Sequence, residues 1–191
     1  MSDDPDSSSS SDTRQIAIAV TILSPAWGQS LSAAEPLARR AALAALAVAH
    51  APGAPHAAAP GCGLAEREAE LSLVLADDAT VARLNRDYRG REGPTNVLSF
   101  PAADAAAPDA GGPVLLGDVV LAYETVRAEA ERQGIGLADH LCHLVAHGVL
   151  HLLGYDHRTE AEAAAMERLE SAALAGLGVP DPHVLTVRSL V

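Results

Sequence analysis

The pattern of hydrophobic and polar positions divides the chain into strand-like and helix-like segments. Four segments predict strands: residues 15–23 (QIAIAVTIL), 68–77 (which contains ELSLVLAD), 96–100 (NVLSF) and 114–122 (VLLGDVVLA). They are rich in Val, Ile and Leu, or they alternate apolar with polar positions, as strands with one or both faces buried do. Five helices are predicted, over residues 32–50, 79–89, 124–134, 137–153 and 159–175.

The helix boundaries are predicted from residues that cap helices. Ser32 is placed to cap the first helix, and Asp77 or Asp78 to cap the second. Thr159 with Glu162 has the spacing of a capping box at the start of the last helix. These signals fix where the helices begin more closely than hydrophobicity alone.

The order of these elements favours a helix-rich α/β fold. The 191 residues are 49% hydrophobic, mostly Ala, Leu and Val, and only 3% aromatic, which suits small-residue helix packing better than a β-sandwich. We expect an α/β (α+β) fold with a small mixed sheet of about four strands surrounded by helices, in a single domain over residues 14–179. Residues 1–13 form a Ser/Asp tail that is expected to be disordered, residues 51–63 and 102–112 are expected loops, and residues 180–191 are a C-terminal extension.

The charge of the chain restricts its partners. The formal net charge is −12, of which the first fourteen residues supply −3, from Asp3, Asp4, Asp6 and Asp12 against Arg14. The remaining −9 gives no global attraction for nucleic acid or anionic membranes, so nucleic-acid binding requires a local basic or metal-bearing groove.

The cysteines and the apolar runs indicate the compartment. Cys62 and Cys142 form no CxxC pair, as expected of a reducing environment. No run of eighteen apolar residues is present, and MSDDPDSSSS lacks the features of a signal peptide. We expect a cytoplasmic protein.

The segment HGVLHLLGYDH, residues 147–157, carries the chemistry that stands out most in this chain. His147 and His151 are four residues apart and project from one helix face, within reach of a common ion. Gly154 can adopt a left-handed conformation that turns the chain back and delivers His157 to the same point. Three neutral imidazoles on Zn²⁺ leave a fourth position for water, as in catalytic zinc sites. The 137–153 helix is thus expected to be a zincin-like metal-site helix, with Gly148 as a tolerated interruption.

Two further histidines on this helix do not fit the same ion. His143 and His151 are eight residues apart, about 12 Å along a helix, too far to share an ion. For His140 and His143 we expect either satisfied core positions or contacts that support the ligands. The spacing HxxxHxxGxxH is also that of metzincin proteases, but Gly148 stands where their pattern has a general-base glutamate, which weakens a protease interpretation.

Three separate blocks of the sequence resemble one known family. HGVLHLLGYDH resembles the signature of the YbeY family of bacterial metal-dependent endoribonucleases, also called rRNA maturation factors. YRGREGPTNVLSFP, residues 88–101, is similar to that family's arginine-containing segment and the strand after it. LGDVVLAYETVRAEAERQG, residues 116–134, is similar to its strand–helix unit, and the resemblance covers roughly residues 70–178 in family order.

The resemblance implies a function and a set of site residues. It implies one zinc ion per chain held by His147, His151 and His157, with Arg89 as the functional arginine. The implied activity is single-strand-specific, zinc-dependent endoribonuclease cleavage in late-stage ribosome maturation, including processing of the 3′ end of 16S rRNA and ribosome quality control. The implied partners are single-stranded RNA or an rRNA precursor, and the small ribosomal subunit with its associated proteins.

The residues themselves leave several roles open. Arg89 suits bidentate phosphate contact, but it equally suits a cation at the end of a helix. Arg83, Arg86 and Arg91 form a locally basic segment with it and are candidates for RNA contacts. Asp156 is a candidate proton acceptor or a group that orients a ligand, and the nucleophile is water or a ribose 2′-hydroxyl. Two other functions stay open: a metal-dependent hydrolase of another substrate such as a peptide, and a non-catalytic ribosome-associated protein whose zinc serves folding.

Overall fold

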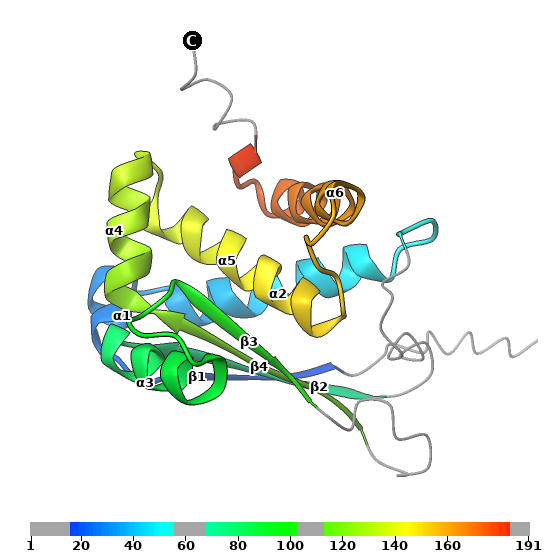
Figure 1. Ribbon diagram of the computed structural model, residues 1–191. Coiled ribbons are helices and arrows are strands. Elements are labelled where there is room, and N and C mark those ends of the chain that lie inside the picture. Colours follow the sequence, from blue (N-terminus) through cyan, green and yellow to red (C-terminus); the bar gives the residue numbers. More distant parts are fainter. Residues whose placement is uncertain (1–15, 56–67, 103–112, 184–191) are drawn as a thin grey trace, which may run out of the picture.

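The computed structural model describes residues 16–55, 68–102 and 113–183, in which four strands and six helices form (Figure 1). In chain order they are β1 (Ile16–Ile22), α1 (Ala26–Ser30), α2 (Ala34–Ala49), β2 (Ala69–Ala76), α3 (Asp78–Arg89), β3 (Val97–Pro101), β4 (Val114–Ala122), α4 (Tyr123–Gln133), α5 (Leu137–Leu152) and α6 (Glu160–Leu177). The expected tail 1–13, together with most of the loops 51–63 and 102–112 and of the extension 180–191, lies outside the described residues. The predicted α/β fold is confirmed.

The four strands form one mixed sheet. Their order is β1-β2-β4-β3, with β1 parallel to β2, β2 parallel to β4, and β3 antiparallel to β4. The hydrophobic residues of β2 show why the sheet has a covered face: Leu71, Leu73 and Leu75 alternate along the strand and all belong to the main core. The predicted number of strands and the mixed character of the sheet are confirmed.

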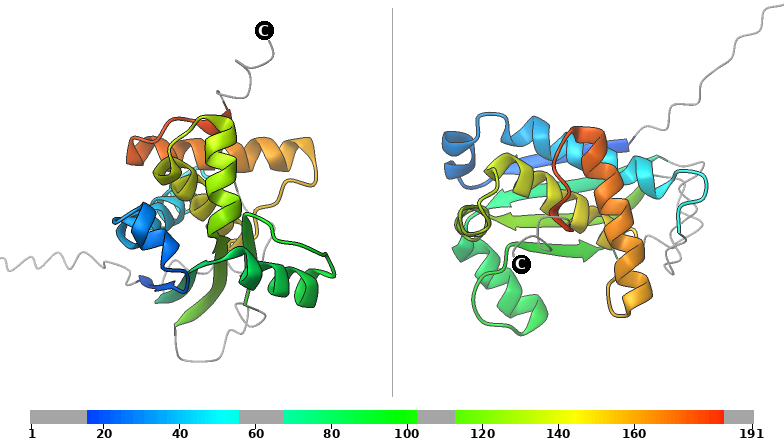
Figure 2. Two further views of the ribbon diagram at one scale, coloured as in Figure 1. Left: turned by 90° about the vertical axis from the view of Figure 1, so that its left-hand side faces the viewer. Right: turned by 90° about the horizontal axis from the view of Figure 1, so that it is seen from above.

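The helices cover the two faces of the sheet unequally. α2 and α5 lie on one face, and α6 packs across both of them as an outer layer (Figures 1 and 2). On the other face α3 covers one part, where Val81 joins Leu98 and Val120 in a smaller apolar cluster. None of the described helices is long and apolar enough to cross a membrane.

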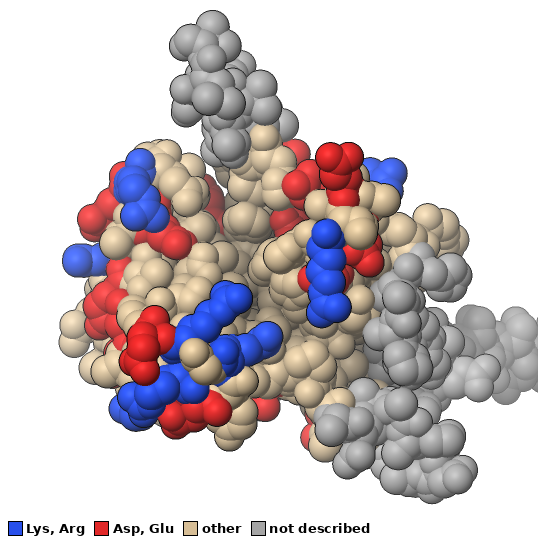
Figure 3. Space-filling model, in the orientation of Figure 1, with Lys and Arg blue, Asp and Glu red and all other residues tan. Residues whose placement is uncertain are grey.

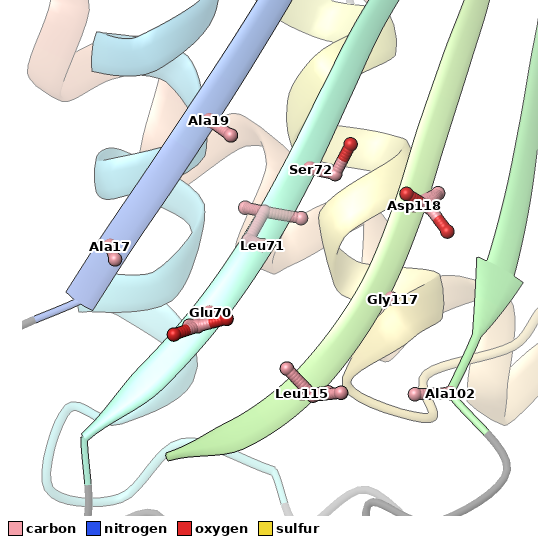
Figure 4. Close-up of a pocket in the computed structure, with 9 residues that line it drawn as sticks. All are labelled: Ala17, Ala19, Glu70, Leu71, Ser72, Ala102, Leu115, Gly117 and Asp118. Carbon is pink, nitrogen blue, oxygen red and sulfur yellow. The ribbon is translucent and has the colours of Figure 1, made fainter.

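The part of the second face that α3 leaves bare carries a shallow depression of about 280 Å³ (Figure 4). Glu70, Ser72 and Asp118 are its polar lining. A register shift between β2 and β4 occurs beside it, where Gly117 has a φ of +123° and a Cβ atom would lie 2.1 Å from the carbonyl oxygen of Phe100. Glycine is therefore required at position 117. The depression beside it opens on the face of the sheet that points away from α5.

α5 approaches the sheet closely at Gly148. A Cβ atom on Gly148 would lie 2.6 Å from Cγ1 of Val119 and 3.1 Å from Oγ of Ser99. Ser99 Oγ also donates a hydrogen bond of 3.1 Å to the Gly148 carbonyl oxygen. As expected, the helix continues through Gly148. The structure adds a reason for the glycine, because the close packing of α5 on β3 and β4 leaves no room for a side chain.

The start of α2 also differs from the prediction. Its N-cap is Ala33, which makes no side-chain cap, so Ser32 is not the cap residue. The short helix α1 was not predicted; Trp27 anchors it by complete burial and by a 3.0 Å hydrogen bond from Nε1 to the Ala76 carbonyl oxygen. A five-residue helix is too short to show a hydrophobic period, so it carries no sequence signal of its own.

The predicted caps of the later helices are confirmed. Asp77 caps α3 by accepting a 2.8 Å hydrogen bond from the Thr80 backbone N–H. Thr159 and Glu162 form the capping box of α6. α3 ends at Arg89, and α6 carries the buried Glu170. The two caps therefore help to position both of these side chains.

Candidate metal centre

Three histidines converge at the carboxyl end of α5. One ring nitrogen from each of His147, His151 and His157 lies within 4.8 Å of the others. The Nε2 atoms of His147 and His151 are 3.0 Å apart. The ring of His157 stacks on that of His147, with 5.7 Å between centroids and 26° between planes. The three imidazoles singled out in the sequence therefore surround one point.

A glycine turn brings the third histidine back to the helix. Gly154 has a φ of +86°, and its N–H donates to the His151 carbonyl oxygen. The next N–H, of Tyr155, donates to the Leu150 carbonyl oxygen, which closes the end of α5. The Tyr155 hydroxyl donates a 2.6 Å hydrogen bond to the Pro55 carbonyl oxygen, so the turn is tied to the segment after α2. The predicted left-handed reversal at Gly154 is confirmed.

Hydrogen bonds fix which nitrogen of each ring faces the cluster. His147 Nδ1 lies 2.7 Å from Oε1 of Glu170, and His151 Nδ1 lies 2.9 Å from the Tyr155 carbonyl oxygen. Both partners accept, so each Nδ1 carries the hydrogen and each Nε2 of a neutral ring presents a lone pair. Two lone pairs facing each other at 3.0 Å repel unless a cation or a proton lies between them.

This donor set fits a zinc ion. Two nitrogens that each bind a tetrahedral Zn²⁺ at about 2.0 Å lie about 3.3 Å apart, close to the observed separation. Burial is the main cause that lowers the pKa of His151, and the neighbouring His147 lowers it further. The neutral, metal-binding form of His151 is thereby favoured near neutral pH.

Sequence reasoning missed Glu170, which supports the cluster from α6. Its side chain is 3% exposed, and its two oxygens contact His147, His143 and His183. Burial by itself raises the pKa of Glu170, but the hydrogen bonds from His143 and His147 outweigh it and hold the pKa well below the usual range of a glutamate. One feature of the sequence could have indicated that Glu170 is buried: it lies next to Leu169, on the apolar face of α6 that also contains Met166.

The other histidines of α5 occupy supporting positions. His140 is buried, with Nε2 2.9 Å from Oε2 of Glu129, while its Nδ1 has no hydrogen-bond partner among the described residues. His143 contacts Glu170, which in turn contacts His147, so Glu170 connects the two rings. On the same helix, burial raises the pKa of Cys142 to about 11, so its thiol stays protonated and inert.

Arg89 ends α3 and connects to α5 through β3. Its Nη2 donates a 2.8 Å hydrogen bond to the Ser99 carbonyl oxygen, and its guanidinium lies 6.0 Å from the centroid of the Phe100 ring. The Ser99 hydroxyl in turn donates to the Gly148 carbonyl oxygen, which lies between His147 and His151 along α5. Arg89 is thus joined to the histidine helix by two consecutive hydrogen bonds.

The remaining arginines of this segment lie at the surface. Arg83, Arg86 and Arg91 are exposed, and Figure 3 shows Arg side chains gathered over α3 and the turn after it, with acidic residues beside them. A local basic surface therefore exists on a protein of net charge −12.

Asp156 organises the turn before His157. One of its carboxylate oxygens accepts a 2.8 Å hydrogen bond from the His157 backbone N–H, and the other accepts one of 2.6 Å from Arg158. The backbone hydrogen bond is the main cause that lowers the pKa of Asp156. Both of these bonds hold the turn, and neither is made to a ligand imidazole.

Comparison with known proteins identifies the family. The family model described as Endoribonuclease YbeY matches residues 57–178. A protein of this name from Paramagnetospirillum magneticum is 54% identical over 90% of this chain and 98% of its own, and one from Rhodospirillum rubrum is 52% identical over 82% and 76%. A solution structure of a Thermotoga maritima protein has a TM-score of 0.48 at 18% identity, over 85% of this chain and 91% of that one. From the family match and the identity to these relatives, the chain belongs to the Endoribonuclease YbeY family.

Proposed function

We propose that this protein is a zinc-dependent endoribonuclease that holds one Zn²⁺ per chain on the Nε2 atoms of His147 and His151 and on His157. The observation that carries the proposal is the convergence of three imidazoles within 4.8 Å, with the Nδ1 atoms of two of them fixed by acceptors. Three protein ligands leave one position of a tetrahedral ion open, as in catalytic sites. When bound there, zinc supplies Lewis acidity and lowers the pKa of water.

The residues around the ion have separate tasks. Glu170 and the Tyr155 carbonyl oxygen hold the rings of His147 and His151 in the metal-binding tautomer. Arg89 binds the phosphate at the cleavage position, because its bond to Ser99 engages one of the five guanidinium N–H groups and leaves the others for phosphate oxygens.

The substrate is single-stranded RNA, which the exposed arginines of α3 and the following turn contact through its backbone. These residues are Arg83, Arg86 and Arg91. The relatives are named Endoribonuclease YbeY, which supports RNA as the substrate. By family resemblance we place the reaction in the cytoplasm, in late-stage ribosome maturation on the small subunit, at the 3′ end of 16S rRNA and in ribosome quality control.

Two observations argue against the other functions considered. A metzincin-like peptide hydrolase needs a glutamate at position 148, and the packing of Gly148 against Val119 leaves no room for one. A zinc that serves folding alone has four protein ligands, whereas this cluster offers three among the described residues.

The first experiment measures metal content and cleavage together. Purified wild type and His151→Ala are analysed for zinc and assayed on a single-stranded fragment of 16S rRNA and on the same fragment in a duplex. We expect about one zinc per chain in the wild type, and loss of both zinc and single-strand cleavage in the variant. Wild-type protein that holds zinc but cuts neither RNA would refute the nuclease proposal.

A second experiment tests Arg89 separately from the metal. Arg89→Ala should lower cleavage about 10²- to 10³-fold, the usual loss when one stabilising donor is removed from a reacting oxyanion, with zinc content unchanged. Arg132→Ala is the matched control, since it removes an arginine whose side chain is 70% exposed on α4. Equal cleavage by Arg89→Ala and Arg132→Ala would remove Arg89 from the site.

A further inference from the structure

We propose that His143, Glu170 and His183 form a second site for a divalent cation, adjacent to the first and joined to it through Glu170. One ligand atom from each of these residues lies within 4.8 Å of the others. The site combines three elements, α5, α6 and the turn that follows α6. It does not depend on the nuclease activity proposed above, because it concerns metal binding alone.

The geometry suits a small cation of the zinc class. Oε2 of Glu170 is 2.8 Å from Nε2 of His183 and 3.3 Å from Nε2 of His143. Ligands about 2.0 Å from a tetrahedral ion lie about 3.3 Å apart, so small movements of the rings suffice to admit one. Two imidazole nitrogens and one carboxylate oxygen are a donor set typical of Zn²⁺ and Co²⁺ rather than of Mg²⁺ or Ca²⁺.

The charge of Glu170 gives the second argument. Its side chain is 3% exposed, and the contacts described for both its oxygens are to imidazoles. Among the described residues, no arginine or lysine contacts either oxygen, so the carboxylate has no permanently charged partner there. A buried charge requires a compensating charge, and a cation on Oε2 provides it while Oε1 still accepts from His147.

The site is also reachable from solvent. The side chains of His143 and His183 are 20% and 31% exposed, whereas that of Glu170 is 3% exposed. An ion can therefore reach the site past the two histidines, with Glu170 as its innermost ligand. His183 is held in place because its backbone N–H donates a 2.9 Å hydrogen bond to Asp181. Binding uses the Nε2 lone pairs of both imidazoles, so the hydrogen that each Nε2 donates to Glu170 moves through solvent to Nδ1 of the same ring while Nε2 bonds the ion.

The test counts bound ions per chain. Full-length protein without a histidine tag is stripped with a chelator, dialysed and titrated with Co²⁺, whose visible absorption reports coordination; bound metal is then measured by elemental analysis. With Co²⁺ in excess, the second site fills in addition to the first, which is the one that keeps its zinc through purification. We therefore expect two Co²⁺ ions per wild-type chain after titration and one in His183→Ala or His143→Ala. His157→Ala should lose the other ion and keep this one. His50→Ala, which removes an imidazole that contacts the Leu46 carbonyl oxygen, is the matched control and should bind two.

The variants separate failure of this proposal from failure of the first site. Equal Co²⁺ stoichiometry in wild type and His183→Ala, with circular dichroism showing both folded, would overturn the second site. Equal stoichiometry in wild type and His157→Ala would instead overturn the first. A His157→Ala protein that binds no Co²⁺ at all also contradicts an independent site on Glu170.

Discussion

Replacement of Gly148 by alanine tests whether close packing of α5 on the sheet positions the metal ligands. The added methyl group would lie 2.6 Å from Cγ1 of Val119, a β-branched and fully buried side chain that has little freedom to move away. It would also lie 3.1 Å from Oγ of Ser99, whose hydrogen bond to the Gly148 carbonyl ties α5 to β3. α5 must then shift away from the sheet, together with His147 and His151.

The magnitude follows from two opposing effects. Alanine is favoured over glycine in a helix by about 1 kcal/mol, and overpacking a core costs about 1–3 kcal/mol. Gly176→Ala isolates the first effect, because Gly176 lies within α6 and a Cβ atom there meets nothing within 4 Å. We therefore expect Gly148→Ala to be about 1–3 kcal/mol less stable than Gly176→Ala. For a chain of this size, a difference of about 2 kcal/mol corresponds to about 4–8 °C in Tm.

The assay is thermal unfolding of wild type and both variants in the presence of a chelator, so that bound metal does not contribute to stability. Zinc content of untreated protein is measured in parallel. We expect Gly176→Ala to be at least as stable as wild type and to keep its zinc, and Gly148→Ala to be less stable than Gly176→Ala and to hold less zinc. Equal Tm values for the two variants would refute the packing argument.

Three further predictions concern the same site and its support. Glu170→Gln should weaken zinc binding about 10- to 100-fold, as measured by competition with a chelator. Glu167→Gln, at an exposed position of the same helix, should leave zinc binding unchanged. Asp77→Ala should lower the free energy of unfolding by about 1 kcal/mol through loss of the α3 cap, with zinc content unchanged in elemental analysis. Because burial lowers the pKa of His151, protons compete with metal for this ring only in acid: dialysis at a series of pH values should show zinc retained near neutrality and lost below about pH 6.5. Half-loss above pH 7 would contradict this order.

The elements that could be predicted from sequence are those whose signal is local. β4 has the predicted bounds because Val and Leu dominate the segment on both sides of Gly117 and Asp118. α6 begins at Glu160 because Thr159 and Glu162 form a capping box within four residues. α1 could not be predicted, since its stability comes from Trp27 and the distant Ala76 carbonyl. The prediction of Ser32 as a cap was wrong because α2 begins at Ala34, and its N-cap, Ala33, makes no side-chain hydrogen bond. A residue type that favours capping does not by itself fix the residue at which a helix begins.

The candidate site divides in the same way. His147, His151 and His157 lie within eleven residues, and the glycine turn that brings them together is encoded between them. Glu170 and His183 join through packing of α6 on α5, and no spacing along the chain announces that contact. The sequence therefore pointed to the three histidines that converge, while the groups that orient their rings needed the tertiary structure.

Position 148 shows how the same ligand spacing leads to different chemistry. A residue that follows a ligand in a helix points about 100° away from it, and in this fold that direction is the sheet. The packing against Val119 and Ser99 excludes a carboxylate there, so the general base that metzincins place on the ligand helix cannot come from position 148 of α5. The nearby carboxylates that the structure describes, Glu170 and Asp156, are already engaged by imidazoles and by the turn. The proposed site thus combines three convergent histidines with Arg89 and has no free carboxylate base among these groups. Such a combination suits charge stabilisation on a phosphate better than water activation at a peptide bond.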